Sequence, residues 1–479
     1  MPQAGTNEDL FICVLRCRES GCVRCGGVGV GLSLFAGRDY RHLFAAQVVA
    51  LFGTGLATVA LALLAYDLAG ERAGAVLGTA LVIKMLAYVV IAPLAGAYAD
   101  RLPRRGFLAV LDVVRAAVVL ALPFVTEIWQ VYLLIFVLQS ASAAFTPTFQ
   151  AVLPDILPDE KQYTRALSAS SLASSMETLL SPVLAAALLS VMSFHWLFSG
   201  TTAGFLASAL LVLTTRVPRA KPTARTAVLD RVAAGARIFL ATPRLRAVLA
   251  LDLAVAGAGA VVMVNTVNYV HDVLGFADAE VALLLAANGV GTIVVALALP
   301  RVLDRLAERT VMTTGALALC AGLAGALGLS LVDGGWAAAL AVWALLGAGA
   351  GLVLTPVGRV LRRSTAEADR PAIFAAQFSL SHACWLLSYP IAGWGVTAFG
   401  FTAGWAALGV LTAGGTIAAV VLWPRRDPEV LTHVHYDVPA DDDHIADAVR
   451  TADGGWRHAH AFTIDGRHRR WPGGVPVSA

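Results

Sequence analysis

Stretches of about 20 apolar residues recur along most of this chain, and short charged segments separate them. An α-helix of that length crosses the hydrocarbon core of a bilayer. Hydrophobic residues make up 58% of the 479 positions and charged residues only 14%, whereas an ordinary soluble domain carries roughly 25% charged residues. A fold that faces water cannot cover so much apolar surface, so the sequence predicts a membrane protein with many spans.

Twelve apolar windows are long enough to span a bilayer. They cover residues 43–69, 75–99, 106–126, 130–152, 165–192, 195–215, 247–271, 279–300, 310–332, 336–358, 372–397 and 400–423. The longest break, at 216–246, divides them into two sets of six. We therefore expect an all-α membrane protein of 12 transmembrane helices in two pseudo-symmetric six-helix bundles. The bundles are expected over residues 38–215 and 247–423, with residues 216–246 as a cytoplasmic linker.

Basic residues lie almost entirely on one side of the expected membrane. With the N-terminus inside, the inner loops hold 20 Lys and Arg, and the outer loops hold one, Arg72. Positively charged loops stay in the cytoplasm, so this asymmetry predicts that both termini are cytoplasmic. One missed helix would scramble the alternation, so the count also supports the number of helices. We expect a multi-pass protein of the bacterial inner (plasma) membrane.

Two segments outside the windows have patterns of their own. Residues 1–37 hold a cluster of four cysteines, at Cys13, Cys17, Cys22 and Cys25. Their spacing could hold a tetrahedral metal ion, but a disordered leader is the simpler interpretation. In the linker, the stretch from Thr226 to Phe239 mixes apolar and charged residues. It is interpreted either as an amphipathic helix on the inner membrane surface or as a solvated linker.

A dense charged segment separates the second and third windows, and it reads Gly96-Ala-Tyr-Ala-Asp100-Arg101-Leu-Pro-Arg104-Arg105. A weaker copy follows the eighth window at Asp304-Arg305. With these residues the chain resembles the major facilitator superfamily, whose signature at that place is G-x-x-x-D-R-x-G-R-R. Pro103 stands here instead of the family's last glycine. The resemblance covers residues 38–425 and implies alternating access around a site between the two halves.

The fifth window resembles the exporter branch of that family. Exporters tend to carry G-P-x-x-G-G there, and this chain has Ser181-Pro182-Val-Leu-Ala185-Ala186. Small residues let helices pack closely, and proline allows a local bend. The Arg-Ala-Leu near residue 165 and Asp112-x-x-Arg115 resemble the enterobactin exporter and the nickel-resistance permeases within that branch. The His-bearing tail favours the nickel-resistance side.

The charged segments are expected to act as a latch on the cytoplasmic side. On the family's pattern the gating residues are Gly96, Asp100, Arg101, Arg104, Arg105, Asp112, Arg115, Asp304 and Arg305. Arg104 or Arg105 can reach the end of a neighbouring helix, whose carbonyl groups attract cations. Such a cluster would hold the inner side closed and part as the halves rock. A role in topology alone is the alternative.

Three ionisable residues, Lys84, Glu177 and His382, lie roughly 14–18 Å along their expected helices. Each is a functional candidate because charge is costly in lipid. Glu177 is the first candidate for proton coupling, since burial favours the protonated form of a carboxyl group. Lys84 could pair with Glu177 or bind an anion, and His382 could titrate or bind metal. A structural ion pair and a packing histidine are the alternatives.

Neutral polar side chains in the windows suggest a path for substrate. The expected substrate-binding residues are Gln47, Gln139, Asn265, Asn268, Asn288 and Gln377. Asn265 and Asn268 are three residues apart and share one helix face. Hydrogen bonding between helices would account for any one of these residues, and their number favours a polar path.

The segment after the last window, residues 424–479, is polar and rich in histidine. Six of the ten histidines lie there, at His433, His435, His444, His458, His460 and His468. Residues two apart in an extended segment point the same way, so each of the two H-x-H pairs could chelate one ion. Imidazole suits nickel, zinc, copper and cobalt, and the tail has no thiolate for a closed structural zinc site. The alternative is a disordered acidic tail in which histidine is incidental.

No phosphate-binding loop of the form G-x-x-x-x-G-K-[ST] occurs, and nothing indicates an enzyme. We expect a monomeric, proton-coupled exporter that needs no cofactor and binds no nucleic acid. Its partners would be protons, the lipid bilayer and a small-molecule or metal-ion substrate, with nickel or cobalt as the favoured cargo. Two alternatives stay open: an efflux pump for a drug, macrolide or siderophore, and a membrane receptor or interaction protein that transports nothing.

Overall fold

The computed structural model describes most of the chain. It covers residues 37–98, 103–157, 160–216, 235–332, 335–365, 370–425, 430–436 and 442–464, with Phe35, Asp427, Val438, His468 and Trp471. Several sequence-based expectations lie outside these residues: Asp100 and Arg101 of the charged segment, the four N-terminal cysteines, and most of the linker.

Each of the first six expected windows holds a long helix. The helices are α3 (Arg38–Ala69), α4 (Ala73–Tyr98), α5 (Arg104–Ala121), α6 (Ile128–Ile156), α7 (Glu160–Leu189) and α8 (His195–Thr214). A capping box of Glu127 and Gln130 begins α6, which satisfies backbone N–H groups that have no partner inside the helix. Pro103 lies immediately before α5, at a position where its missing N–H costs nothing.

The second half repeats the pattern with more interruptions. Its helices are α10 (Pro243–Ala260), α11 (Thr266–Asn268), α12 (Asp278–Leu303), α13 (Glu308–Leu331), α14 (Gly335–Leu354), α15 (Val357–Arg363), α16 (Arg370–Pro390) and α17 (Val396–Leu422). Turns of π-helix at Val261–Asn265 and Tyr269–Val273 flank α11, and another at Ile391–Gly395 joins α16 to α17. Gly400, with φ of 81°, breaks α17 where the last two windows were expected to meet.

Nine stretches of the described residues are long and apolar enough to cross a membrane. Four of them run through a pair of helices: Arg38–Ile91 covers α3 and most of α4, Pro243–Val273 covers α10 and α11, Gly335–Arg363 covers α14 and α15, and Ala372–Leu422 covers most of α16 and all of α17. The expected fold of two helical bundles is therefore confirmed.

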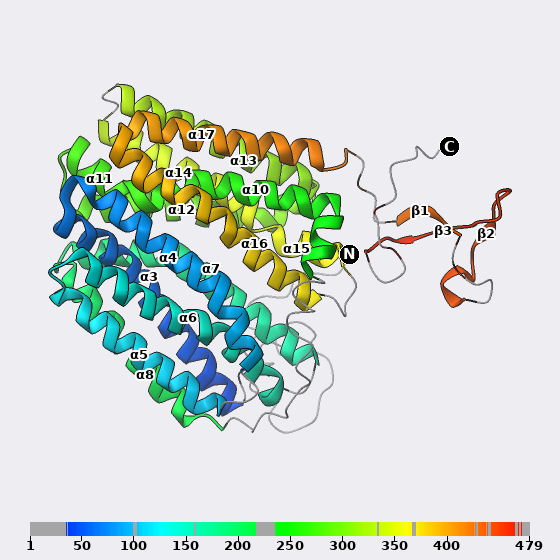
Figure 1. Cartoon of the computed structure of the whole chain (residues 1–479), viewed down its shortest axis with the longest axis horizontal. Coiled ribbons are helices and arrows are strands. Elements are labelled where there is room, and N and C mark those ends of the chain that lie inside the picture. The colour runs from blue at the N-terminus through cyan, green and yellow to red at the C-terminus, as the bar shows by residue number, and fades with distance from the viewer. Residues whose placement is uncertain are drawn as a thin grey trace, which may run out of the picture.

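The helices form two bundles that lie side by side (Figure 1). In the first, α3 packs on α7 and α8, and α5 packs on α6 and α8. In the second, α14 lies against α12 and α13, and α10 lies against α16 and α17. The bundles meet where α4 packs on α16 and where α7 packs on α12.

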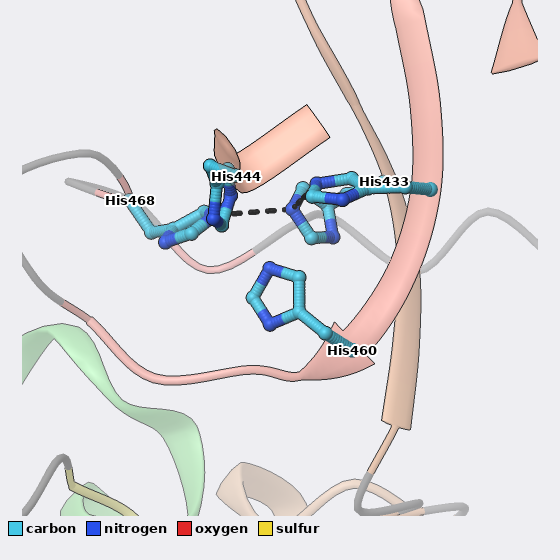
Figure 2. Close-up of side chains that lie close together, drawn as sticks. His433, His444, His460 and His468 are labelled. Atoms are coloured by element: carbon cyan, nitrogen blue, oxygen red, sulfur yellow. Dashed lines mark hydrogen bonds between the residues drawn. The ribbon is translucent and has the colours of Figure 1, made fainter. Parts of the chain in front are cut away.

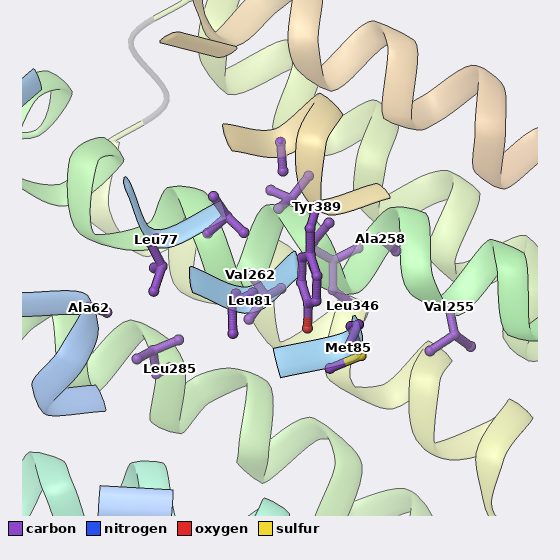
Figure 3. Packing of buried hydrophobic residues seen from close by; sticks show 14 of the residues in the cluster. Ala62, Leu77, Leu81, Met85, Val255, Ala258, Val262, Leu285, Leu346 and Tyr389 are labelled. Atoms are coloured by element: carbon purple, nitrogen blue, oxygen red, sulfur yellow. The ribbon is translucent and has the colours of Figure 1, made fainter. Parts of the chain in front are cut away.

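An apolar core runs across this junction. Figure 3 shows Leu81 and Met85 of α4 beside Tyr389 of α16 and Val262 of the seventh span. These side chains belong to one continuous buried cluster. The junction is thus held by packing between apolar surfaces.

Polar contacts and close glycines lock the bundles together at one end. Tyr66 donates a hydrogen bond to Asp272 at 2.6 Å, and Asn268 donates to the carbonyl oxygen of Gly70 at 3.2 Å. A Cβ atom on Gly78 would lie 2.9 Å from the Cα atom of Gly393, so the backbones of α4 and the π-turn nearly touch. We call this group of six residues the clamp: Tyr66, Gly70, Gly78, Asn268, Asp272 and Gly393. The clamp lies at the end away from the charged segment that precedes α5.

We predict that Gly78→Val will lower the apparent melting temperature of the protein in lipid nanodiscs. The added side chain must push two backbones apart, and overpacking of this kind costs about 1–3 kcal/mol. Gly414→Val is the matched control, because a Cβ atom on that helical glycine meets nothing within 4 Å. Equal melting temperatures for the two variants would contradict the close contact.

The tail adds a small β-sheet, which the expectation of an all-α protein did not include. Strands β1 (Val430–His435), β2 (Val449–Arg450) and β3 (Trp456–Ala461) are antiparallel in the order β1-β3-β2. A 3₁₀-helix, η8, follows at Asp443–Ile445 between β1 and β2. Valine and threonine in β1 favour the extended conformation, and the tail lies beyond the spans, where a sheet edge can meet water.

The tail is anchored to one end of the second bundle (Figure 1). Phe462 and Ile464, just after β3, are each 3% exposed and belong to the main apolar core. The ring of Trp471 lies 5.1 Å from the guanidinium of Arg244 at the start of α10. The histidine segment is therefore held beside the first turn of the seventh span.

Candidate metal centre and membrane-embedded polar residues

The register of β1 and β3 brings four histidines onto one face of the sheet. His433 lies opposite His458, Leu431 opposite His460, and His435 opposite Trp456. Because side chains two apart in a strand share a face, both H-x-H pairs point the same way from neighbouring strands. The two pairs therefore meet at one place, whereas the sequence suggested a separate ion for each.

Two further histidines complete the cluster from outside the strands. His444 lies on η8, where its backbone N–H donates to the Asp442 carboxylate at 2.9 Å. His468 follows β3 and is 5% exposed. Figure 2 shows the rings of His433, His444, His460 and His468 pointing toward a common centre.

The ring nitrogens of this cluster are close together. The Nε2 atom of His433 lies 3.0 Å from those of His435 and His468 and 3.1 Å from that of His458. His444 Nε2 lies 3.2 Å from the Nε2 atoms of His435 and His468. We call the six residues 433, 435, 444, 458, 460 and 468 the hexahistidine cluster.

Burial keeps members of the cluster neutral. Burial, reinforced by the charge of neighbouring imidazoles, lowers the pKa of His433 to about 4, and the same causes lower the pKa of His458 to about 4. A neutral imidazole presents a nitrogen lone pair, which is the form that binds metal. His433 and His458 therefore present nitrogen lone pairs near neutral pH.

The three ionisable candidates in the spans lie near one another at the junction of the bundles. Lys84 of α4 is within electrostatic reach of Glu177 of α7 and of His382 of α16. The Nδ1–H group of His382 donates a hydrogen bond to the carbonyl oxygen of Phe378 at 2.6 Å, and the ring stacks on Tyr88 of α4 with centroids 5.5 Å apart. The histidine thus packs across the junction.

Glu177 and Ser181 are positioned by Gly55 of α3. A Cβ atom on Gly55 would lie 2.1 Å from the Ser181 hydroxyl oxygen and 2.7 Å from Glu177 Oε1. The polar face of α7 around the exporter-like sequence therefore lies directly against the α3 backbone. Only glycine leaves room for both side chains.

The predicted latch residues of the first half fall into two places. Arg105 donates to the carbonyl oxygen of Leu213, in the last turn of α8, where the helix carries partial negative charge. Asp112 and Arg115 form a buried ion pair, and Ser208 of α8 donates to Asp112 at 2.7 Å. This pair braces α5 against α8 inside the bundle.

In the second charged copy, the buried and paired residue is a different one from the two expected to act in gating. Asp304 and Arg305 are exposed, and neither has an ion pair with any residue that the structure describes. Glu308, four residues later, is buried and pairs with Arg359 at 2.7 Å and with Arg363 at 3.5 Å. The sequence showed these charges but did not show which ones would be buried.

Asp427 extends this charged cluster to the start of the tail. Its carboxylate pairs with Arg363 and, at 3.2 Å, with Arg244, which is only 2% exposed. Trp423 donates its indole N–H to the same carboxylate at 3.2 Å. One carboxylate therefore ties α10, α15 and the end of α17 together just before β1.

The six neutral polar candidates are dispersed among the helices. Asn265 donates to the carbonyl oxygen of Ala392 at 2.7 Å, and Asn288 donates to that of Trp343 at 3.1 Å. Gln47 accepts a hydrogen bond from Ser170 at 2.8 Å. Across the described part of the chain, no recorded hydrogen bond joins two of these six side chains.

Two of the six have other surroundings. Gln139 lines a cavity of about 20 Å³ inside the first bundle together with Thr54 and Thr58. That volume suits about one water molecule. Asn268 belongs to the clamp, where it also donates to Asp272 at 2.8 Å.

Asp252 of α10 is a buried carboxylate that sequence analysis missed. It is 3% exposed and accepts a hydrogen bond from Gln377 of α16 at 2.8 Å. Its other oxygen, Oδ1, and the amide oxygen Oε1 of Gln377 are both buried without a hydrogen-bond partner among the described residues. The sequence alone could have indicated this residue, because Asp252 is an acidic residue inside the apolar window 247–271.

Family comparison decides what kind of protein carries this arrangement. The model of the Major Facilitator Superfamily matches residues 43–277 and 248–440. The chain belongs to this superfamily. The match makes it a multi-pass membrane protein of a transporter superfamily.

Similar curated proteins match only part of the chain. Macrolide efflux protein A of Enterococcus faecalis is 29% identical over 153 residues, which cover 30% of this chain and 47% of that protein. Macrolide efflux protein A of Streptococcus pyogenes is 27% identical over 185 residues, 38% of this chain and 45% of that protein. The uncharacterized MFS-type transporter YfiS of Bacillus subtilis is 29% identical over 127 residues, 26% and 30% of the two chains. The chain thus spans less than half the length of these relatives.

Solved structures share the fold over a longer part of the chain. A D-xylose-proton symporter has a TM-score of 0.62 at 16% identity and covers 80% of this chain and 97% of its own. The nucleoside transporter NupG has a TM-score of 0.60 at 15% identity and covers 80% and 98%. These likenesses show the fold of the superfamily. The nickel-resistance and enterobactin branch stays a prediction.

We predict that Asp427→Asn will lower the apparent melting temperature of the transporter by several degrees. Arg244 would keep its buried charge but lose its carboxylate partner, and breaking a buried pair in this way costs about 3–5 kcal/mol. Asp304→Asn removes an exposed carboxylate without a recorded ion pair and should leave the melting temperature unchanged. An equal response of both variants would contradict the role of Asp427.

Proposed function

We propose that this transporter exports a divalent transition-metal ion, such as nickel or cobalt, in exchange for protons. The convergence of six imidazoles in the anchored tail carries this proposal. Imidazole nitrogen is a preferred donor for such ions. The cluster is joined to the start of α10 through two aromatic rings: Phe462 contacts His468, and Trp471 contacts both Phe462 and Arg244. A captured ion would thus be held at the end of the second bundle.

The direction of transport follows from charge. Lys and Arg lie on the side of the tail, so both termini are assigned to the cytoplasm of a bacterial inner membrane. The clamp then closes the outer side, and the hexahistidine cluster faces the cytoplasmic supply of the ion. An ion captured on the cytoplasmic side and released on the outer side is exported.

Two carboxylates are assigned to proton coupling. Glu177 lies at the junction of the bundles, within electrostatic reach of Lys84, so its charge would change as the junction opens. Asp252 has no ion pair among the described residues, and its Oδ1 atom and the Oε1 atom of Gln377 are both buried without a hydrogen-bond partner there. A proton on Asp252 would supply the missing donor.

Macrolide efflux is the second candidate function. It is favoured by the curated relatives, two of which are named macrolide efflux proteins. The apolar junction around Tyr389 would suit a bulky apolar substrate. Under this alternative the hexahistidine cluster would be dispensable for transport.

Inverted membrane vesicles with an imposed proton gradient separate the two functions. Metal export predicts gradient-driven uptake of radiolabelled nickel into vesicles that contain the transporter, and no uptake without the gradient. Macrolide efflux predicts uptake of a labelled macrolide and none of nickel. Deleting residues 430–479 should slow nickel uptake and leave macrolide uptake unchanged. Macrolide uptake alone would overturn the metal proposal.

We predict that Glu177→Gln and Asp252→Asn will each reduce proton-driven uptake by roughly tenfold or more, because a neutral amide cannot exchange a proton. Asp67→Asn is the control, since Asp67 is exposed near the end of α3. Counterflow of cargo without a gradient should survive in both test variants if they still fold and bind cargo. Full gradient-driven uptake by either variant would remove that carboxylate from the coupling step.

A further inference from the structure

We propose that the hexahistidine cluster holds one metal ion in six-coordinate, octahedral geometry and thereby selects nickel and cobalt over zinc. This inference rests on the proposed uptake of metal by the tail. It concerns the shape of the site, which the H-x-H pattern of the sequence does not specify.

The six rings are arranged as the corners of an octahedron. Twelve of their fifteen pairs have ring centroids 4.6–5.1 Å apart. The pairs outside that set are His433–His444, at 6.5 Å, His435–His460 and His458–His468. Each histidine thus has four near neighbours and one opposite partner, which is the relation among the six corners of an octahedron.

The strand register explains one of the opposite pairs. His433 and His458 face each other across the strands, so they are neighbours. His435 and His460 lie on either side of that pair, in opposite directions along the sheet, and are therefore far apart. His444 and His468 approach from η8 and from the segment after β3, and they occupy the corners that the strands leave open.

The spacing of the nitrogens fits a first-row metal. With metal–nitrogen bonds of about 2.1 Å, neighbouring donors of an octahedron are about 3.0 Å apart and opposite donors about 4.2 Å. Recorded Nε2–Nε2 distances between neighbours are 3.0–3.2 Å. Donor atoms of five members, including the opposite pair His433 and His444, all lie within 4.8 Å of one another.

These dimensions leave room for a single ion. Two ions in one site lie about 3.5–4 Å apart and each needs its own donors. Donors that all lie within 4.8 Å of one another surround one centre. The two H-x-H pairs therefore act as halves of one site.

Geometry and donor type decide which ion the site favours. Zinc prefers four donors in a tetrahedron, and copper(II) prefers a tetragonal arrangement. Nickel(II) and cobalt(II) accept six nitrogens, and nickel binds more tightly than cobalt, iron or manganese in the usual order of affinity. Six imidazoles provide no thiolate to draw zinc instead.

Cobalt(II) spectroscopy on the purified full-length transporter tests the geometry. Six-coordinate cobalt absorbs visible light weakly, whereas tetrahedral cobalt absorbs intensely. We expect weak absorption that saturates at one cobalt per chain, and displacement of cobalt by an equal amount of nickel but not of zinc. Intense absorption, saturation at two ions, or preferential displacement by zinc would overturn the proposal.

A variant pair assigns the ion to this cluster. His460→Gln removes one corner and should weaken nickel binding by at least about tenfold, while His195→Gln, at an exposed position on α8, should leave binding unchanged. Circular dichroism and the melting temperature check that the variant folds. Equal nickel affinity in the two variants would place the ion elsewhere.

The binding and transport measurements can contradict the octahedral site and the metal-export proposal separately. An octahedral single-ion signal without nickel uptake in vesicles would overturn metal export and keep the octahedral site. Nickel uptake with a tetrahedral cobalt spectrum would keep metal export and overturn the octahedral site.

Discussion

The interior of a bilayer offers no hydrogen-bond partner to the backbone, and this constraint shapes every part of the transporter. Within the spans the chain must satisfy its own N–H and C=O groups, so it forms helices. The irregular π-helical turn at Ile391–Gly395 is tolerated because the Asn265 side chain donates a hydrogen bond to the carbonyl oxygen of Ala392. Outside the spans the constraint is lifted, and the tail forms a sheet.

The same constraint sorts the charged side chains. Pairs that remain inside the bundles, such as Asp112 with Arg115, are buried with their partners and brace helices. Pairs at the end that carries the basic loops, such as Glu308 with Arg359, join helices and the tail. A carboxylate inside the spans that lacks such an ion pair can still accept a proton, and Asp252 is an example among the described residues.

Helices and their order could be predicted because apolar length is a property of each segment alone. The tail histidines could be identified as candidate metal ligands for a similar reason, since the donor atom is a property of the residue type, and metal binding by them stays a prediction. Partners could not be predicted, because they depend on which helices become neighbours. Gln377 appeared as a path residue, yet it hydrogen-bonds Asp252. Asp304 appeared as the second latch, yet Glu308 is the buried member. The joint site of the two H-x-H pairs required the strand register.

Both ends of the tail segment contact the side chain of Arg244. Asp427 precedes the strands and Trp471 follows them, and both lie on this one guanidinium. The chain between Asp427 and Trp471 is therefore a closed loop, and both of its ends contact the first turn of α10. Doubling the length of such a loop adds only about 0.6 kcal/mol of closure entropy. Insertions between the strands should thus be tolerated far better than substitutions of Asp427, Trp471 or Arg244. The length of the tail can therefore vary, whereas its point of attachment to α10 cannot.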